Sequence, residues 1–199
     1  MFYEPAKNDH GLPYRPFKAL VGPRPIGWIS TLSPNGVANL APYSFFNGVA
    51  DDPPVVLFSS LDVKDSQRNA EATGEFVCNI VSYELREAMN ATSAAAPPEV
   101  DEFELAGLAK APCRLVKCPR VAEAPAALEC TYIKTVDLPG RDGGANAYSV
   151  VFGLVVAVHI ADEMISGGMV DAAKLRQLAR LGYQDYAFVE NVFSLKRPE

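Results

Sequence analysis

The sequence predicts a mainly β protein, an antiparallel, Greek-key-like barrel with helices at its periphery. Runs of β-like residues follow one another with only short helical segments between them, which is typical of a barrel and not of a doubly wound sheet. An Asn35-Gly36 dipeptide joins two of these runs and indicates a tight hairpin. No G-x-G-x-x-G motif follows a strand, so a dinucleotide-binding Rossmann fold has no support.

The first half of the chain alternates strands with one capped helix. An irregular lead-in over residues 1–23 contains four prolines. A helix capped by Asp65 or Ser66 is expected to run to Thr73 and to end at Gly74. The prolines of Asp51-Asp52-Pro53-Pro54 indicate a turn there and not a pair of catalytic carboxylates. The four strands expected in this half are Ile26–Leu32, Val37–Phe46, Val55–Ser60 and Phe76–Val81.

The second half is expected to add two long strands and further short helices. The strands are Leu128–Val136 and Tyr148–Ile160, separated by a turn over Leu138–Gly144. Apolar spacing predicts a helix over Asp171–Leu181, and Val189–Leu195 is predicted to be a last short strand. Two more helices are expected, at Tyr83–Ala91 and Asp101–Ala106.

Composition limits the class of protein. The 199 residues fit one domain, 1–199, and 49% hydrophobic with 21% charged residues is typical of a soluble globular chain. No apolar run approaches the ~20 residues that span a bilayer, so no membrane association is expected. The N-terminus lacks the order of a signal peptide, which makes the cytoplasm the default location. A net charge of −6 without a basic run disfavours nucleic acid as a partner.

No metal site is expected from the cysteines and histidines. Only Cys113 and Cys118 lie near each other among four cysteines, and the chain has two histidines, His10 and His159. This spacing, without neighbouring ligands, is a weak signal for zinc. Four reduced and mostly buried thiols are expected instead.

Charged and hydroxyl side chains gather where the third strand ends and the first helix begins. Ser59 and Ser60 end the strand, and Lys64, Ser66 and Arg68 start the helix. A helix start offers free N–H groups and the positive end of its dipole, which suits a phosphate. The alternative is an ordinary capped helix start with solvated cations.

Three other features admit two interpretations each. Strand alternation sends Tyr43, Phe45 and Asn47 to one side, with Ser44 on the other, so one face of this aromatic run belongs to the core. Trp28 is either a core indole or a ring near a ligand. A lone histidine at the end of an apolar strand, as His159 is, is a hydrogen-bonded core residue or a functional one.

Several segments together resemble one known family. They cover residues from about 15 to the end and are Arg24–Trp28, Asn39–Asn47, Asp52–Pro54, Lys64–Asn69, Gly74–Val77, Phe152-Gly153 with Val158–Ile160, and Leu178–Gly182. In their order and spacing they resemble the flavin reductase-like family. These are FMN-binding split barrels that include flavoredoxins and the reductase components of two-component monooxygenases.

The resemblance implies that these residues bind two different parts of the cofactor. Ser59, Ser60, Lys64, Ser66 and Arg68 would hold the FMN 5′-phosphate. The strand from Pro42 to Phe45 would lie along the flavin, with FAD as the alternative flavin. The remaining side chains implied to contact the ring are Thr31, Asn39, Tyr43, Ser44 and Asn47.

The resemblance also implies a reaction. A histidine near position 159 lies on the nicotinamide side of the flavin in similar proteins, so His159 is the catalytic candidate. NADH or NADPH would transfer a hydride to flavin N5, a step that depends mainly on how the two rings are positioned. Gly182-Tyr183 stands where many relatives have Gly-Gly, which is a departure in this loop.

Partners follow from the same resemblance. A homodimer is expected to complete each flavin pocket, and reduced flavin or electrons would pass to a monooxygenase or another acceptor. Two alternatives stay open: an FMN electron carrier similar to flavoredoxin, without significant NAD(P)H activity, and a ligand-binding barrel with no flavin.

Overall fold

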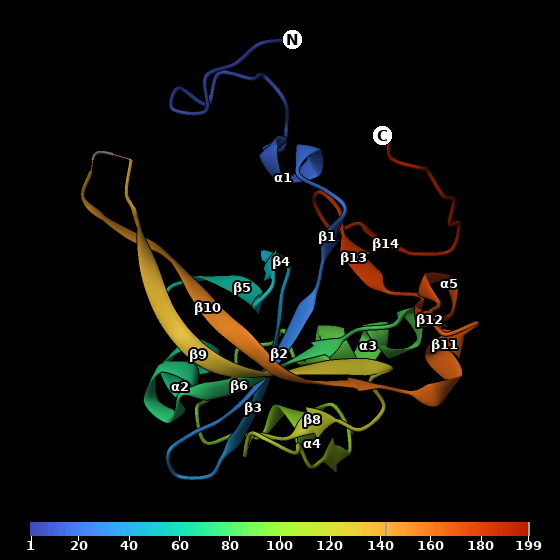
Figure 1. Ribbon diagram of the computed structural model, residues 1–199. Helices are drawn as coiled ribbons and strands as arrows, with labels where there is room; N and C mark the ends of the chain where they lie inside the picture. Colours follow the sequence, from blue (N-terminus) through green and yellow to red (C-terminus); the bar gives the residue numbers. More distant parts are fainter. Residues whose placement is uncertain (142, 199) are drawn as a thin grey trace.

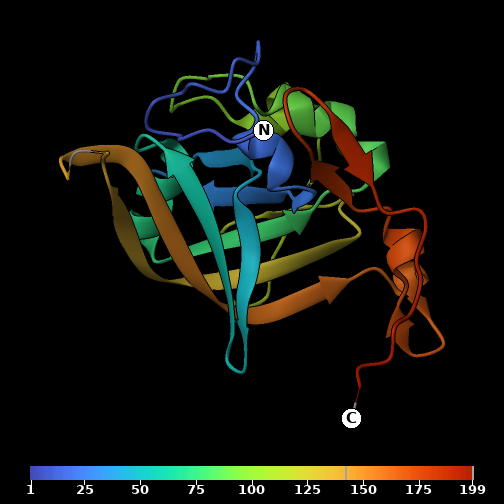
Figure 2. The ribbon, with the colours of Figure 1, turned by 90° about the horizontal axis from the view of Figure 1, so that it is seen from above.

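The body of the protein is a curved, seven-stranded antiparallel sheet. The computed structural model describes residues 1–141 and 143–198. The strand order is β3-β2-β6-β9-β10-β5-β4, and every neighbouring pair is antiparallel. The sheet curls (Figures 1 and 2), and its two edge strands are joined in sequence through Ser44-Phe45. The strands are β2 (Gly27–Leu32), β3 (Ala38–Tyr43), β4 (Phe46–Asp51), β5 (Pro54–Leu61), β6 (Glu75–Ile80), β9 (Ala126–Pro139) and β10 (Ala145–Ile160).

Smaller elements surround this sheet. β1 (Arg24–Pro25), β13 (Leu178–Arg180) and β14 (Tyr186–Phe188) form a three-stranded sheet. Two short pairs are β7 (Lys110–Ala111) with β8 (Arg120–Val121), and β11 (Ile165–Ser166) with β12 (Met169–Val170). The α-helices are α1 (Phe17–Leu20), α2 (Asp65–Thr73), α3 (Arg86–Ala91), α4 (Glu102–Leu105) and α5 (Ala172–Leu175), with 3-10 turns at Tyr83–Leu85 and Asp162–Met164. In the described residues no helix has the length and apolar character that crossing a bilayer requires.

The curved sheet buries apolar side chains on both of its faces. Along β2, Trp28 joins a cluster with Leu40 and Phe103, while its neighbour Ile29 joins a second cluster with Phe58. This alternation follows from the two-residue period of a strand. Trp28 Nε1 donates to Thr92 Oγ1 at 2.9 Å, so the only tryptophan is a core residue.

Two of the predicted elements are wrong in extent or type. The predicted strand Val37–Phe46 breaks at Ser44-Phe45, where the chain passes from β3 to β4. The predicted helix Asp171–Leu181 stops at Leu175 because Arg176 adopts a left-handed conformation with φ +45°. The following residues form β13, which pairs with β1 and β14, so this pairing overrides the helical spacing.

The last predicted strand is also absent, and the other elements are confirmed. Residues 189–198 carry no regular structure, and β14 precedes them. The long strands, α2 with Gly74 in its left-handed C-cap, and the short helix near residue 102 all form. The predicted cap of α2 is wrong, because Asp65 and Ser66 lie inside the helix and the N-cap residue is Lys64. Of the predicted turn over Leu138–Gly144, Asp142 lies outside the described residues.

Candidate functional site

The start of α2 has free backbone donors and a cation beside it. Lys64 is the N-cap residue in extended conformation, and its side chain makes no capping hydrogen bond. The first N–H groups of α2 therefore lack a side-chain acceptor at this cap. Lys64, Ser66 and Arg68 line a cavity of about 560 Å³, together with Ser44 and Ser59. Hydroxyls, cations and a helix start thus meet in one cavity, a donor set suited to a phosphate.

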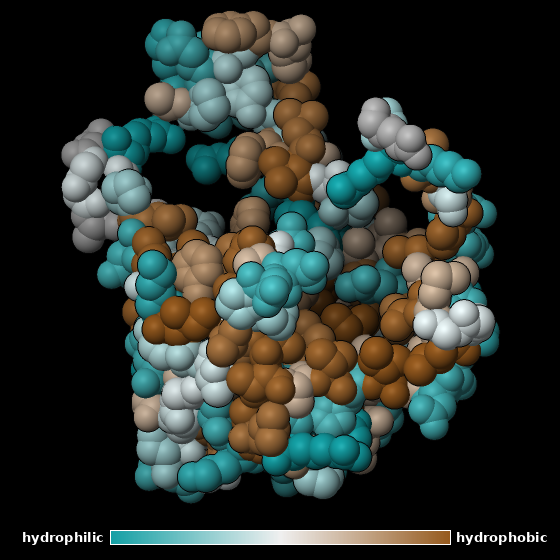
Figure 3. Space-filling model, in the orientation of Figure 1, coloured by the Kyte–Doolittle hydropathy of each residue, from teal (hydrophilic) through white to brown (hydrophobic). Residues whose placement is uncertain are grey.

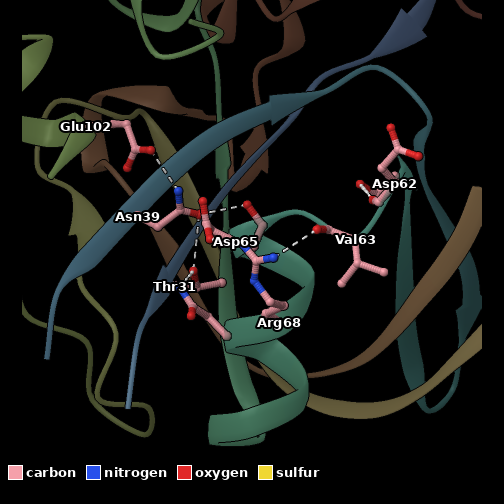
Figure 4. Close-up of polar contacts among 10 residues, drawn as sticks. Thr31, Asn39, Asp62, Val63, Asp65, Arg68 and Glu102 are labelled. Carbon is pink, nitrogen blue, oxygen red and sulfur yellow. Dashed lines mark hydrogen bonds and ion pairs between the residues drawn. The ribbon is translucent and has the colours of Figure 1, made fainter. Parts of the chain in front are cut away.

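Arg68 is held by its own helix rather than by the core. Its guanidinium forms an ion pair with Asp65 and donates to the Val63 carbonyl at 3.3 Å (Figure 4). The Arg68 side chain is about half exposed, so it can turn toward a ligand at little cost. The Asp65 carboxylate therefore competes with any bound anion for the Arg68 guanidinium.

A buried polar network fixes the floor of this cavity. Ser66 Oγ donates to Asn39 Oδ1 at 2.8 Å, and Asn39 Nδ2 donates to Glu102 Oε1 at 2.9 Å (Figure 4). The Leu40 N–H donates to the second Glu102 oxygen at 3.0 Å. Burial raises the pKa of the Glu102 carboxyl above its ordinary value. The hydrogen bonds from Leu40 and Asn39 lower it, but by less than burial raises it. The network orients Ser66 and Asn39 for a ligand before one binds.

The Tyr43 hydroxyl is a buried polar group without a hydrogen-bond partner among the residues described. Tyr43 belongs to β3 and lines the same cavity. Burial raises the pKa of its phenol, so the hydroxyl stays protonated and is a donor. The neighbouring Ser66 and Ser60 hydroxyls lower the same pKa in part, so Tyr43 belongs to the buried polar floor of the cavity.

A second cavity, of about 990 Å³, adjoins the first. The two share Lys18, Ser44, Phe45, Ser59 and Tyr148 as lining residues. Strand alternation explains the rest of its floor: Leu57 of β5 faces this cavity with Asn47 of β4 and Val150 of β10, which pair with β5. The residues of the N-terminal lead-in form its opposite wall. This space is wide, partly apolar and next to the polar cavity.

The structure brings together most of the predicted cofactor-binding residues, but not all of them. Thr31 is buried behind Asn39, to which it donates at 3.3 Å. Ser60 points into the barrel because it alternates with Ser59, and its hydroxyl donates to the Asp62 carbonyl at 2.8 Å. The residues that line one or both cavities are Asn39, Pro42, Tyr43, Ser44, Phe45, Asn47, Ser59, Lys64, Ser66 and Arg68.

His159 is not brought to this site. It lies eleven residues beyond Tyr148 on β10, about 36 Å along the strand. Its Nε2 lies 2.5 Å from Glu129 Oε1, and Glu129 is fully buried. Cys113 Sγ completes a group whose atoms lie within 4.8 Å of one another, but backbone N–H groups of residues 114–116 occupy both Glu129 oxygens. The surroundings of His159 are those of a structural ion pair.

Sequence reasoning missed several residues that line the cavities. Glu102 was expected only as part of a short helix, and Lys18, Arg24 and Tyr148 were not singled out. Lys18 and Arg24 lie 5.9 and 5.6 Å from the centre of the Phe45 ring, where they add positive charge. These residues are far apart in sequence, so no local motif marks them.

Comparison with known proteins agrees with this geometry. The flavin reductase like domain matches residues 22–185. An uncharacterized protein of Aquifex aeolicus is 41% identical, over 90% of this chain and 91% of its own. Nitrilotriacetate monooxygenase component B from Bacillus cereus superposes with a TM-score of 0.90 at 31% identity, covering 98% of both chains.

A second solved structure is also similar. The 2-nitrobenzoate 2-nitroreductase of Pseudomonas fluorescens has a TM-score of 0.86 at 28% identity, with 100% of this chain and 96% of that chain covered. The fold is that of the flavin reductase split barrels. The chain belongs to the flavin reductase-like family.

Proposed function

We propose that this chain, acting as one domain, binds FMN and reduces it with NADH or NADPH. The observation that carries the proposal is the pair of adjoining cavities on the outer face of β4, β5 and β10. One offers cations, hydroxyls and a helix start for a phosphate, and the other offers a wide, partly apolar space for a flat ring. The shared residues between them match a ligand that is polar at one end and aromatic at the other.

The phosphate end has its donors in place. Lys64 and Arg68 supply positive charge, Ser59 supplies a hydroxyl, and the first turn of α2 supplies backbone N–H groups, while the Ser66 hydroxyl proton is already donated to Asn39. The residues present therefore fit a ribityl phosphate.

The ring end needs positioning more than acid–base chemistry. When bound, FMN accepts a hydride from the reduced nicotinamide. The segment from Pro42 to Phe45, at the end of β3 and the start of the link to β4, supplies backbone donors and acceptors, and Leu57 and Val150 supply apolar contact. Lys18 and Arg24 beside Phe45 favour added negative charge in the cavity.

A second copy of the chain is expected to cover part of this site. The C-terminal segment exposes Phe193 and Leu195, which are 82% and 84% exposed, and the lead-in exposes Phe17 and Leu20. Figure 3 shows exposed hydrophobic residues on the face drawn there. Exposed apolar side chains of this number favour a homodimer. Light scattering at micromolar protein should give the mass of a dimer, and a monomer mass would contradict it.

Titration of the apo-protein with FMN tests the binding step, and rapid mixing with NADH or NADPH under anaerobic conditions tests the reaction. We expect quenching of flavin fluorescence on binding and rapid bleaching of the flavin absorbance. Binding without bleaching would instead support an electron carrier similar to flavoredoxin. If no flavin binds, the alternative that the protein is a ligand-binding barrel without a flavin would be favoured. By analogy with the monooxygenase component, the reduced flavin would serve a partner oxygenase or another acceptor.

A further inference from the structure

The larger cavity is lined by cations and by no carboxylate among the residues that the structure describes. Its basic lining residues are Arg15, Lys18, Arg24 and Arg141. The chain as a whole carries a net charge of −6, with 24 acidic residues against 18 basic ones. A cavity whose charge is opposite to that of its protein attracts anions. The oxidised flavin ring is neutral, and the FMN phosphate has Lys64 and Arg68 in the neighbouring cavity, so these cations are left for a second anion.

The N-terminal lead-in places its acidic and basic residues apart. Glu4 forms an ion pair with Lys7 at 2.7 Å, Asp9 accepts from the Glu4 N–H at 3.1 Å, and neither carboxylate lines the cavity. Arg15 and Lys18, from the same segment, line the cavity and are exposed, so a ligand can reach them. Neither of the two forms an ion pair with a carboxylate of the described chain. Their charges are therefore available to a ligand.

Two of the four cations lie beside the floor of the cavity. Lys18 Nζ and the Arg24 guanidinium lie 5.9 and 5.6 Å from the centre of the Phe45 ring, which lines the cavity. Arg24 is buried, and its guanidinium donates to three backbone carbonyls, so its charge is fixed in place. Burial, and next the charge of Arg180, lower the pKa of Arg24. A bound anion would offset this repulsion between the two arginines.

The fourth cation comes from a distant part of the chain. Arg141 lies at the tip of the β9–β10 hairpin, and Figure 1 shows the lead-in passing above the barrel next to this tip. Its guanidinium donates to the Ala6 carbonyl at 3.0 Å and to the Pro5 carbonyl at 3.4 Å, and Pro5 lines the cavity. A guanidinium has five N–H donors, so donors remain for a phosphate oxygen. Figure 3 shows a hollow between the lead-in and the body of the protein.

We propose that the larger cavity binds the diphosphate of an adenine dinucleotide through Arg15, Lys18 and Arg141, beside the space for the flavin ring. The inference rests on the proposed function, in which this dinucleotide is NADH or NADPH; FAD carries the same group. Guanidinium groups match phosphate oxygens with paired hydrogen bonds, and a diphosphate offers charge for several cations. The cavity of about 990 Å³ is at the upper end of the ~300–1,000 Å³ range of small-molecule sites, so it has room for more than one flat ring.

Calorimetric titration of the FMN-loaded protein with ADP-ribose tests this contact. ADP-ribose carries the diphosphate and the adenine but no nicotinamide, and bound FMN occupies the phosphate site at the start of α2. We expect the parent to bind it, and to bind it more weakly as salt is raised. Arg15→Gln should weaken this binding about three- to tenfold, and Arg15→Lys, which keeps the charge, should recover part of the loss. Equal binding of ADP-ribose by Arg15→Gln and the parent would overturn the proposal.

Lys7→Gln is the matched control for the loss of one positive charge. Lys7 belongs to the same lead-in, but it pairs with Glu4 and lines neither cavity. Its variant should bind ADP-ribose as the parent does. If Lys7→Gln weakens binding as much as Arg15→Gln, the overall charge of the lead-in attracts the ligand, and the contact in the cavity is refuted. Far-UV circular dichroism checks that each variant folds.

Titration of the apo-protein with FAD and with FMN identifies the source of the diphosphate. If FAD binds more tightly than FMN and Arg15→Gln removes the difference, the diphosphate is that of the flavin. Equal affinities for the two flavins, together with binding of ADP-ribose, assign it to the nicotinamide dinucleotide.

The outcomes also distinguish this inference from the proposed function. A parent protein that binds and reduces FMN but does not bind ADP-ribose would refute the diphosphate site alone. A parent that does not bind FMN would refute the proposed function, and its titration with ADP-ribose would still test the cationic cavity.

Discussion

His159 Nε2 and Glu129 Oε1 lie 2.5 Å apart and join β10 to β9, the two longest strands of the described sheet. Glu129 is fully buried, and its carboxylate also accepts from the N–H groups of Arg114, Leu115 and Val116 at 2.6–3.0 Å. This carboxylate therefore holds residues 114–116 against the sheet. Removing a partner from such a buried group leaves charge uncompensated.

His159→Ala should lower the stability of the fold by about 2–3 kcal/mol, because it leaves the buried Glu129 carboxylate with one partner fewer. FMN affinity and the rate of flavin reduction by the folded protein should stay near those of the parent. Urea unfolding and rapid mixing with NAD(P)H measure the two effects. A slower reduction with unchanged stability would instead support the catalytic role that the family resemblance implies for His159.

Acid should weaken the same contact. Burial alone would raise the pKa of Glu129, but hydrogen bonds from Arg114, His159, Leu115 and Val116 lower it to about 2, from an ordinary value of 4.5. A carboxyl whose pKa is lower in the folded state stabilises the fold above its unfolded pKa. This contribution, on the order of 3 kcal/mol, is present at pH 5 and is lost as the pH falls from about 4.5 toward 2.

Glu129→Gln provides the comparison for this acid dependence. The parent should lose stability more steeply than the variant between pH 5 and pH 2, when the free energy of unfolding is measured in urea at each pH. The variant should be the less stable of the two at neutral pH. Parallel pH profiles for the two proteins would show that Glu129 is not the group responsible.

Much of the fold and of the cluster from Lys64 to Arg68 could be predicted from local patterns. The Asn35-Gly36 turn, the alternation along β5 and the helix α2 are set by neighbouring residues, and all of them form. The cluster from Lys64 to Arg68 is compact in sequence, so its members had to lie close together. The helix predicted over Asp171–Leu181 fails because Ala179 and Arg180 pair with the distant strand β1, which no local pattern reports.

The remaining parts of the site depend on contacts between distant segments. Glu102 reaches Asn39 across 63 positions, and Arg141 holds the lead-in across 135. His10 and His159 look alike as lone histidines in the sequence. Only the structure shows that His159 pairs with a buried carboxylate and that His10 instead accepts from a backbone N–H.

Arg68→Ala should weaken FMN binding by about 1.5–3 kcal/mol, which is roughly 10- to 150-fold, because it removes a charge-assisted contact to the phosphate. Fluorescence titration of the apo-protein with FMN measures the change. Arg114→Ala is the control, since its exposed side chain lines neither cavity. Equal dissociation constants for the parent and Arg68→Ala would remove Arg68 from the phosphate site.

Asp65→Asn should have the opposite effect on affinity. The Asp65 carboxylate pairs with Arg68 in the structure and competes with a bound phosphate for the guanidinium. An exposed ion pair contributes about 0.2–1 kcal/mol, so its removal should tighten FMN binding by up to about fivefold. When the same titration is repeated at high salt, the difference in FMN affinity between variant and parent should be smaller. Weaker binding in Asp65→Asn would mean that the carboxylate orients Arg68 for the phosphate instead of competing with it.

Gly153→Ala should destabilise the barrel by about 1–3 kcal/mol through overpacking. A Cβ at this position of β10 would lie 2.2 Å from the tip of the Phe76 ring and 3.2 Å from Cys130 Cβ. Phe76 is fully buried, so the ring has no free space to move into. If this clash is the cause, Gly153→Ala should lower the free energy of unfolding less in a Phe76→Leu protein, whose side chain at 76 is shorter, than in the parent. A double-mutant cycle in urea measures the coupling, and additive effects of the two substitutions would place the strain elsewhere.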